Sequence, residues 1–357
     1  MKFKVLAVWL MMLILSASAS VFAEGVDAGS FVRDGVGARA FGFGGSFTAI
    51  ADDASATFWN PAGIAQLEGI NLSAMHTNRF GLGISFQFLS STVQLNNFGL
   101  GLSLVRSSID DIPYYGDEGD GVFSETQTLI LGSIGYDPGA LFGDLDFGVP
   151  FNLYVGLNGK IYTHSILDGS AQGFGFDVGV LGDFTFEWGE LSFGYVSKDV
   201  TGTQIQWEGT DFNPTNDVPW IHRFGMAASL FEESALVTAE VEFAPQRAHL
   251  NRVHAGIEYW IVKQFGVRVG ATLSEGTARV TYGGTVAYAG FSFDYAYVTH
   301  PALGATHVFS LVYSIPTWWG SDETETIEND GSTDVEGAEG LEPKNDEADE
   351  ESVGETN

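Results

Sequence analysis

The chain has 357 residues and no cysteine, which excludes disulfides, thiolate catalysis and a lipid-modified lipoprotein start. Its formal net charge is −31 at pH 7, and a chain this acidic lacks the basic surface that nucleic-acid binding needs. Only 17% of the residues are charged and the mean hydropathy is +0.08, so the charge is placed unevenly, with much of the acid after Gly320.

The N-terminus has the pattern of a secretory signal peptide. Lys2 and Lys4 precede an apolar run from Val5 to Leu15, and small residues lead to a cleavage site after Ala23. The alternative is an uncleaved anchor helix, but the apolar run is short for a membrane span. We therefore predict a cleaved signal peptide over residues 1–23 and an exported protein.

Residues 24–68 form a compact segment that differs from everything after it. Glycines crowd its first part, and an alanine-rich stretch from Phe47 to Phe58 predicts a short helix. Asn60 and Pro61 end that helix, because proline lacks the N–H that would continue it. Such a segment ahead of a long run of strands suggests a plug for a closed sheet.

Residues 69–316 show hydrophobicity with a period of two, as in Phe174, Phe176 and Val178 against Gly173, Gly175 and Asp177. We predict about fourteen strands, an even number, many of a length that crosses a bilayer when tilted. The expected strands are 69–77, 80–90, 92–105, 125–136, 151–163, 173–187, 190–199, 221–231, 235–245, 252–261, 264–273, 277–288, 290–299 and 304–315. The fold class is all-β, a transmembrane antiparallel barrel with the N-terminal segment as a hatch in its lumen. The alternative is a soluble sandwich or propeller, which gives the same alternation.

The connection lengths suggest an orientation. Long connections at 107–124 and 200–220 are expected outside, and tight turns near Ser91, Gly189, Glu233 and Lys263 inside, with 137–150 as an exception. Both termini then lie in the periplasm, including a disordered acidic tail over 317–357. Expected aromatic girdle residues at the lipid headgroups are Tyr136, Tyr162, Trp188, Trp220, Tyr259, Trp260, Trp318 and Trp319.

The polar face of the strands carries charges of both signs. Hairpin geometry predicts Glu242 near Arg252 or His254, and Glu258 near Arg268. These pairs either hold the wall and seat the hatch, or form a polar constriction that selects what passes. The candidate lumen charges are Arg223, Glu240, Glu242, Arg252, His254, Glu258, Arg268, Arg279 and Asp294, together with Lys160, Asp177 and Asp183.

The run from Gly37 to Ala65 resembles the N-terminal signature of FadL/OMPP1-type outer-membrane proteins, especially their PorV/PorQ-like branch. Those proteins have a Gly-Ala-Arg-Ala start, a glycine cluster, an Ala-Asp-Asp-Ala segment and an Asn-Pro-Ala-Gly end before the barrel. The resemblance implies a fourteen-stranded barrel with a lumenal hatch, although the chain is compact for a fatty-acid transporter and shows no extended outer hairpins. By motif, the hatch turn is Asn60, Pro61, Ala62 and Gly63. Its frame is Gly37, Arg39, Gly42, Gly44, Gly45, Asp52 and Asp53.

The functional expectation is a non-enzyme with no cofactor and no metal site. No Gly-x-Ser-x-Gly elbow occurs, and the histidines lack zinc-ligand spacing. The first hypothesis is passive transport of small hydrophobic or amphipathic molecules, with outer-membrane lipid and a small hydrophobic ligand as partners. The alternative is a docking or secretion-associated barrel, with envelope partners bound through the acidic tail.

Overall fold

The computed structural model describes residues 28–116, 119–139, 149–200, 202–209, 212–245, 247–274 and 276–316. The predicted signal peptide and acidic tail lie outside these ranges. Within them, no helix has the length and apolar character needed to cross a membrane.

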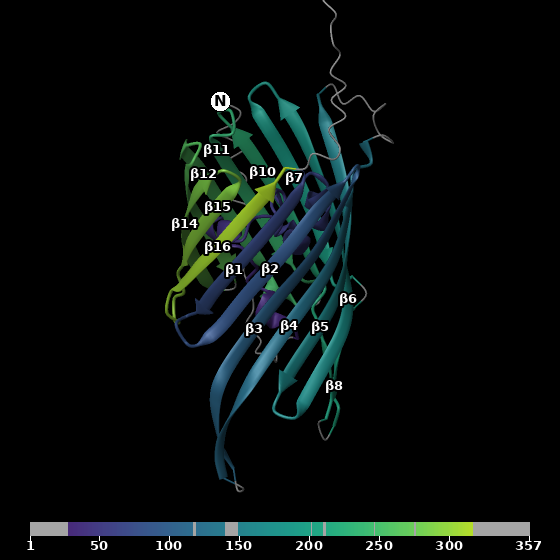
Figure 1. Ribbon diagram of the computed structural model, residues 1–357, viewed down its shortest axis with the longest axis vertical. Helices are drawn as coiled ribbons and strands as arrows, with labels where there is room; N and C mark the ends of the chain where they lie inside the picture. Colours follow the sequence, from purple (N-terminus) through teal and green to yellow (C-terminus); the bar gives the residue numbers. More distant parts are fainter. Residues whose placement is uncertain are drawn as a thin grey trace, which may run out of the picture. The chain divides into compact units, whose positions relative to one another are not determined.

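A closed antiparallel barrel makes up most of the fold (Figure 1). Of the sixteen strands in the described ranges, β8 and β9 form a side hairpin, and the other fourteen close through the β1–β16 and β5–β6 pairings. The first seven wall strands are β1 (Ile70–Arg79), β2 (Ile84–Leu95), β3 (Phe98–Gly116), β4 (Gly119–Tyr136), β5 (Phe151–Ile166), β6 (Gly169–Phe186) and β7 (Gly189–Lys198). The other seven are β10 (Ile221–Leu230), β11 (Ala235–Phe243), β12 (Arg252–Val262), β13 (Phe265–Ser274), β14 (Thr277–Tyr288), β15 (Phe291–Val298) and β16 (Thr306–Ile315). The fourteen-stranded barrel predicted from the sequence is thus confirmed.

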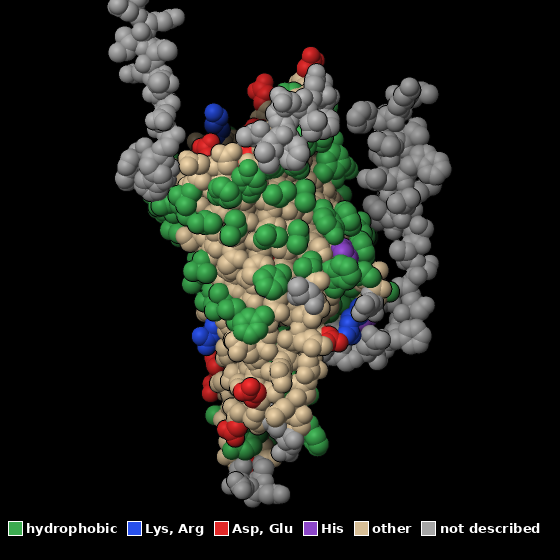
Figure 2. Space-filling model, turned by 90° about the vertical axis from the view of Figure 1, so that its right-hand side faces the viewer, with side chains coloured by type: hydrophobic (Ala, Val, Ile, Leu, Met, Phe, Trp, Pro, Cys, Tyr) green, Lys and Arg blue, Asp and Glu red, His purple; other side chains and the backbone are tan. Residues whose placement is uncertain are grey.

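Side chains alternate across the wall as the period of two requires. On β6, Phe174 and Phe176 are 61% and 53% exposed, whereas Asp177 is 1% exposed. Hydrophobic side chains gather in a band over the wall, and the end carrying the β3–β4 turn is more polar (Figure 2). We call that end, opposite the start of β1 and the end of β16, the outer end. The exposed apolar band requires lipid around the barrel.

Near the outer end, the apolar side chains point inward and the polar side chains point outward. Phe86 and Phe88 on β2 point inward and are fully buried, while Gln87 points outward. Tyr162 also points inward at 2% exposure, so its predicted place in the aromatic girdle is wrong. Here the outer face rises above the apolar band and the inner face packs on the hatch, so apolar side chains lie inside.

The connections differ from prediction at two places. Residues 107–124, expected to form a loop, mostly continue β3 and β4 as a two-stranded ribbon beyond the other strands (Figure 1). An extended outer hairpin is therefore present, contrary to the sequence-based expectation. The connection 200–220 contains β8 (Gln204–Glu208) and β9 (Thr215–Asp217), and the β2–β3 turn lies at Asn96 and Asn97 rather than near Ser91.

The N-terminal segment lies inside the barrel as short helical turns joined by irregular backbone (Figure 1). The helix expected over 47–58 is confined to its last residues, because turns occupy the preceding part. The helical turns are η1 (Ser30–Val32), α2 (Ala38–Gly42), α3 (Ala56–Trp59) and η2 (Pro61–Ala65), and η3 (Ala248–Leu250) joins β11 to β12.

Candidate functional site: the hatch and the outer cavity

The Asn60 side chain organises the turn between α3 and η2. Its Nδ2 donates to Thr48 O at 2.9 Å and to Val180 O at 3.0 Å, and its Oδ1 accepts a hydrogen bond from Ala62 N at 3.2 Å. The residue is fully buried. Asn60 thus caps the 3₁₀ helix that follows and joins two parts of the hatch to the wall.

Four glycines on neighbouring strands receive this turn. Gly99, Gly135, Gly156 and Gly179 lie directly opposite one another across β3, β4, β5 and β6. A Cβ at Gly156 would lie 2.3 Å from Ala62 N, and one at Gly179 would lie 2.2 Å from Asn60 Oδ1. Only glycine lets the hatch backbone approach the wall this closely, and we call these four residues the glycine ladder.

Backbone groups in the middle of the hatch bind charged wall residues. Glu240 accepts hydrogen bonds from Phe47 N at 3.1 Å and Thr48 N at 2.9 Å. Arg223 pairs with Glu240 and donates to Gly45 O at 2.9 Å. The buried ion pair therefore leaves few of its own polar atoms unsatisfied.

A second ion network reaches the hatch through Arg39. The Arg39 guanidinium contacts Asp52 and lies 3.3 Å from Glu258 Oε1. Glu258 also pairs with its cross-strand neighbour Arg268, whose Nη1 lies 3.1 Å from Asp294 Oδ1. These contacts link the hatch to β12, β13 and β15.

Asp34 ties the start of the hatch to the wall. Its Oδ1 lies 3.2 Å from Arg252 Nη1 and 3.1 Å from Arg279 Nη2. Burial alone would raise the pKa of Asp34, but Arg252, Arg279 and Arg79 together hold it well below its usual value. The carboxylate therefore stays ionised over the ordinary pH range.

The structure places the remaining predicted site residues as follows. Glu242 lies 3.5 Å from Arg223 and 3.9 Å from His254, whereas its register partner Arg252 binds Asp34 instead. His254 Nδ1 lies 2.7 Å from Gly44 O. The other positions are Gly37, whose N–H contacts Met75; Gly42, whose carbonyl accepts from Thr281; Asp53, whose carboxylate accepts from Ser55; Pro61 and Gly63, which are buried in η2; and Asp183, which is buried on β6.

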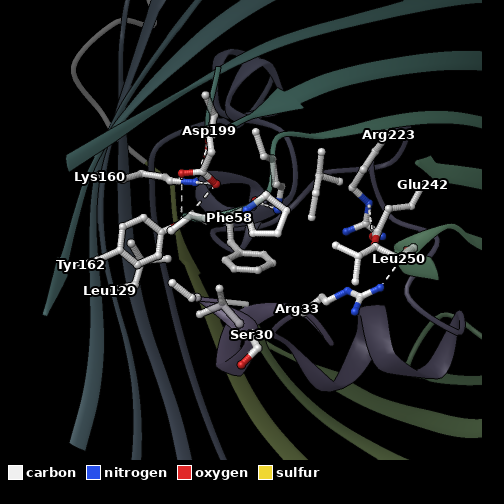
Figure 3. Close-up of a pocket in the computed structure, with 18 of the residues that line it drawn as sticks. Ser30, Arg33, Phe58, Leu129, Lys160, Tyr162, Asp199, Arg223, Glu242 and Leu250 are labelled. Atoms are coloured by element: carbon white, nitrogen blue, oxygen red, sulfur yellow. Dashed lines mark hydrogen bonds and ion pairs between the residues drawn. The ribbon is translucent and has the colours of Figure 1, made fainter. Parts of the chain in front are cut away.

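A partly open cavity of about 210 Å³ lies between the hatch and the outer end (Figure 3). Its polar side holds Lys160, whose Nζ lies 2.8 Å from Asp177 and 2.6 Å from Asp199, with the Tyr162 hydroxyl donating to Asp199 at 3.2 Å. Arg33, Lys198, Arg223 and Glu242 add further charged groups to the lining. The aliphatic and aromatic part of the lining includes Val32, Phe58, Leu129, Leu131, Val218 and Leu250.

Lys198, Tyr162 and Asp199 belong to the polar part of the cavity lining and were not among the predicted site residues. Lys198 Nζ donates to Phe58 O at 2.9 Å and lies 3.9 Å from the centre of the Phe58 ring. Tyr162 was assigned to the girdle, and Asp199 to the end of a strand. Their proximity to Lys160 and Asp177 could have identified them, because those two residues were already predicted to place charge in this part of the lumen.

A family model described as Uncharacterised protein family (UPF0164) matches residues 30–122, which hold most of the hatch and the first strands. No curated protein sequence matches the chain.

Several solved structures share the fold. The toluene transporter TbuX of Ralstonia pickettii has a TM-score of 0.51 and 12% identity, over 80% of this chain and all of its own. The P. putida toluene transporter TodX gives 0.50 and 12%, over 80% of this chain and 99% of its own. The CymD monoaromatic hydrocarbon channel gives 0.52 and 12%, over 79% and 98%.

The fold, its exposed apolar band and the hatch together define a transmembrane β-barrel with a plugged lumen. Within that class the chain has the fold of the hydrocarbon channels. This agrees with the resemblance to FadL/OMPP1-type proteins at the level of fold. Assignment to the PorV/PorQ-like branch stays a prediction.

Proposed function

We propose that the protein carries small hydrophobic or amphipathic molecules passively across the outer membrane. The observation that carries the proposal is the mostly apolar cavity on the outer side of the hatch. A solute that enters at the outer end would rest there and cross when the hatch moves. The hydrogen bonds and ion pairs of the hatch with the wall support a lumen that is closed at rest.

The volume of the cavity suits a solute with one ring. An apolar cavity of about 150 Å³ binds benzene in another protein, and the present cavity is about 210 Å³. TbuX is a toluene transporter and CymD a monoaromatic hydrocarbon channel. A single-ring hydrocarbon is therefore the first solute to test.

The experiment measures toluene flux into proteoliposomes that contain the full chain. Val218→Trp fills the cavity from its lining, and we expect flux to fall several-fold relative to the unmodified protein. Val237→Trp is the matched control, because Val237 is 41% exposed on the lipid side of β11. Equal flux through both variants, or no flux above empty liposomes, would overturn the proposal.

The docking alternative rests on the charge of the tail over residues 317–357, which lies outside the described residues. The described residues support transport more directly, because the cavity has a size and lining suited to a solute.

A further inference from the structure

A second cavity lies beside the first, toward the outer end, and has a volume of about 230 Å³. The two share part of their wall, formed by residues 28–30 and Tyr162. Glu125 on β4 and His164 on β5 line the second cavity, and each lies closer to the outer end of its strand than the residues of the first. A solute entering from outside therefore meets this second cavity, which we call the vestibule, before the apolar one.

The vestibule has a hydrogen-bond acceptor at one side. Glu125 Oε1 accepts from Gln127 Nε2 at 2.7 Å and lies 2.9 Å from His164 Nε2. The side chains of Glu125 and His164 are each 23% exposed, so the carboxylate is held in place yet reachable. Within the part of the chain that is described, the other carboxylate oxygen, Oε2, takes part in no hydrogen bond.

An aromatic corner faces this acceptor. The Trp207 ring lies 4.8 Å from the His164 ring, and the planes meet at 58°. Trp207 Nε1 donates to Asn216 Oδ1 at 3.1 Å, and Trp207 N donates to Pro214 O at 3.0 Å, which fixes the indole on β8. Ile205 adds an apolar side chain to the same lining. The vestibule is thus lined by a flat apolar surface and a carboxylate oxygen, and its size suits a single aromatic ring.

We propose that the vestibule binds a flat ring carrying a hydroxyl or amino group. The ring packs on Trp207 and Ile205, and its hydroxyl or amino group donates to Glu125 Oε2. Hydrogen bonds to an ionised acceptor are stronger than those between neutral groups, so the vestibule favours substituted rings over plain hydrocarbons. The onward movement of the solute past Tyr162 rests on the proposed transport function. Binding in the vestibule does not depend on that function.

The test compares two probes of nearly equal size, 4-methylphenol, which donates a hydrogen bond, and 4-methylanisole, which does not. Equilibrium binding of each is measured on the full chain in detergent, with and without Glu125→Leu. We expect the substitution to weaken 4-methylphenol binding about tenfold, which is about 1.4 kcal/mol, and to leave 4-methylanisole unchanged. Glu125→Gln, which keeps partners for Gln127 and His164, should give a smaller loss in the same direction.

The aromatic part of the site has its own variant. Trp207→Leu should weaken both probes to a similar extent, because it removes the surface on which the ring packs. Trp188→Leu is the control, since Trp188 is 48% exposed at the opposite end of the barrel, and should weaken neither. Equal effects of Glu125→Leu on both probes, or none on either, would overturn the proposal.

Toluene flux separates this inference from the proposed function. If toluene crosses but the preference for 4-methylphenol over 4-methylanisole does not depend on Glu125, the vestibule proposal fails and the transport proposal is retained. If the preference for 4-methylphenol depends on Glu125 but toluene does not cross, the binding site is supported and the transport proposal fails.

Discussion

At the scale of single residues, the buried side chain of Asn60 has the most concentrated role in the hatch. Replacing it with alanine removes two donors to carbonyls and the cap on Ala62 N. Because the groups left behind are buried, we expect Asn60→Ala to destabilise the hatch by about 2 to 4 kcal/mol. Hydrogen exchange of residues 60–66 measures the loss. Asn152→Ala is the control at an exposed asparagine of β5, and an equal effect of both would refute a special role for Asn60.

Asp53 gives the hatch a dependence on pH. Burial and the neighbouring Asp52 carboxylate raise the pKa of Asp53 to about 6. Because this value lies above that of an unfolded chain, about 3.9, the folded hatch binds the proton more tightly. Hatch stability should therefore fall as pH rises from about 4 to about 6 and stay at the lower level above.

Protection factors of residues 51–57 between pH 4 and pH 7 check this expectation. Asp53→Asn keeps an oxygen for Ser55 and should flatten the pH profile, whereas Asp168→Asn in an exposed turn should not change it. A profile of the same slope in Asp53→Asn would assign the dependence to another group.

At the scale of elements, the glycine ladder explains how a hatch with little regular structure keeps one position. Gly156→Ala forces the hatch backbone away from β5, at a cost of about 1 to 3 kcal/mol for overpacking. Gly159→Ala on the same strand is a matched control, because its Cβ would have no atom nearer than 4.0 Å. We expect faster hydrogen exchange of residues 60–66 in the first variant only. Similar exchange in both variants would show that the close approach is not what seats the hatch.

How far the sequence could predict these elements depends on their surroundings. Alternation predicted the wall strands, because lipid on one side and a polar lumen on the other give opposite faces different chemistry. The assignment of Tyr162 to the lipid-facing girdle failed, since near the outer end the inner face is the apolar one. The ribbon of β3 and β4 was missed because its acidic and glycine residues have the composition of a loop. Pairing between the two strands overrides that local preference.

The site was predictable to a similar degree. The motif located the hatch turn at Asn60, and hairpin geometry brought Glu258 beside Arg268. Trp207 and the vestibule could not be predicted from the sequence. They depend on the pairing of β8 with β6, and the length of the connection 200–220 does not predict the path of its chain. Asp34 likewise meets Arg252 only once the chain has folded back into the lumen.

At the scale of the whole molecule, the net charge of −31 is not a property of the lumen. Wall charges there occur in pairs of opposite sign, such as Arg223 with Glu240 and Lys160 with Asp177. Several of these groups also bind hatch backbone, which favours a role in seating the hatch over selecting ions. Once the hatch is removed, a lumen with paired charges should discriminate weakly between cations and anions.

Planar-bilayer conductance tests this expectation on the intact protein and on a variant lacking residues 35–65. We expect the intact protein to be closed to ions, because the hatch backbone contacts the wall at the glycine ladder and at Glu240. The deletion should open a stable pore whose reversal potential in a salt gradient stays near zero. A chain ending at Pro316 is the control and should remain closed. Strong cation selectivity in the deletion variant would mean that unpaired carboxylates dominate the lumen, and ion flow through the intact protein would mean that the hatch does not close it.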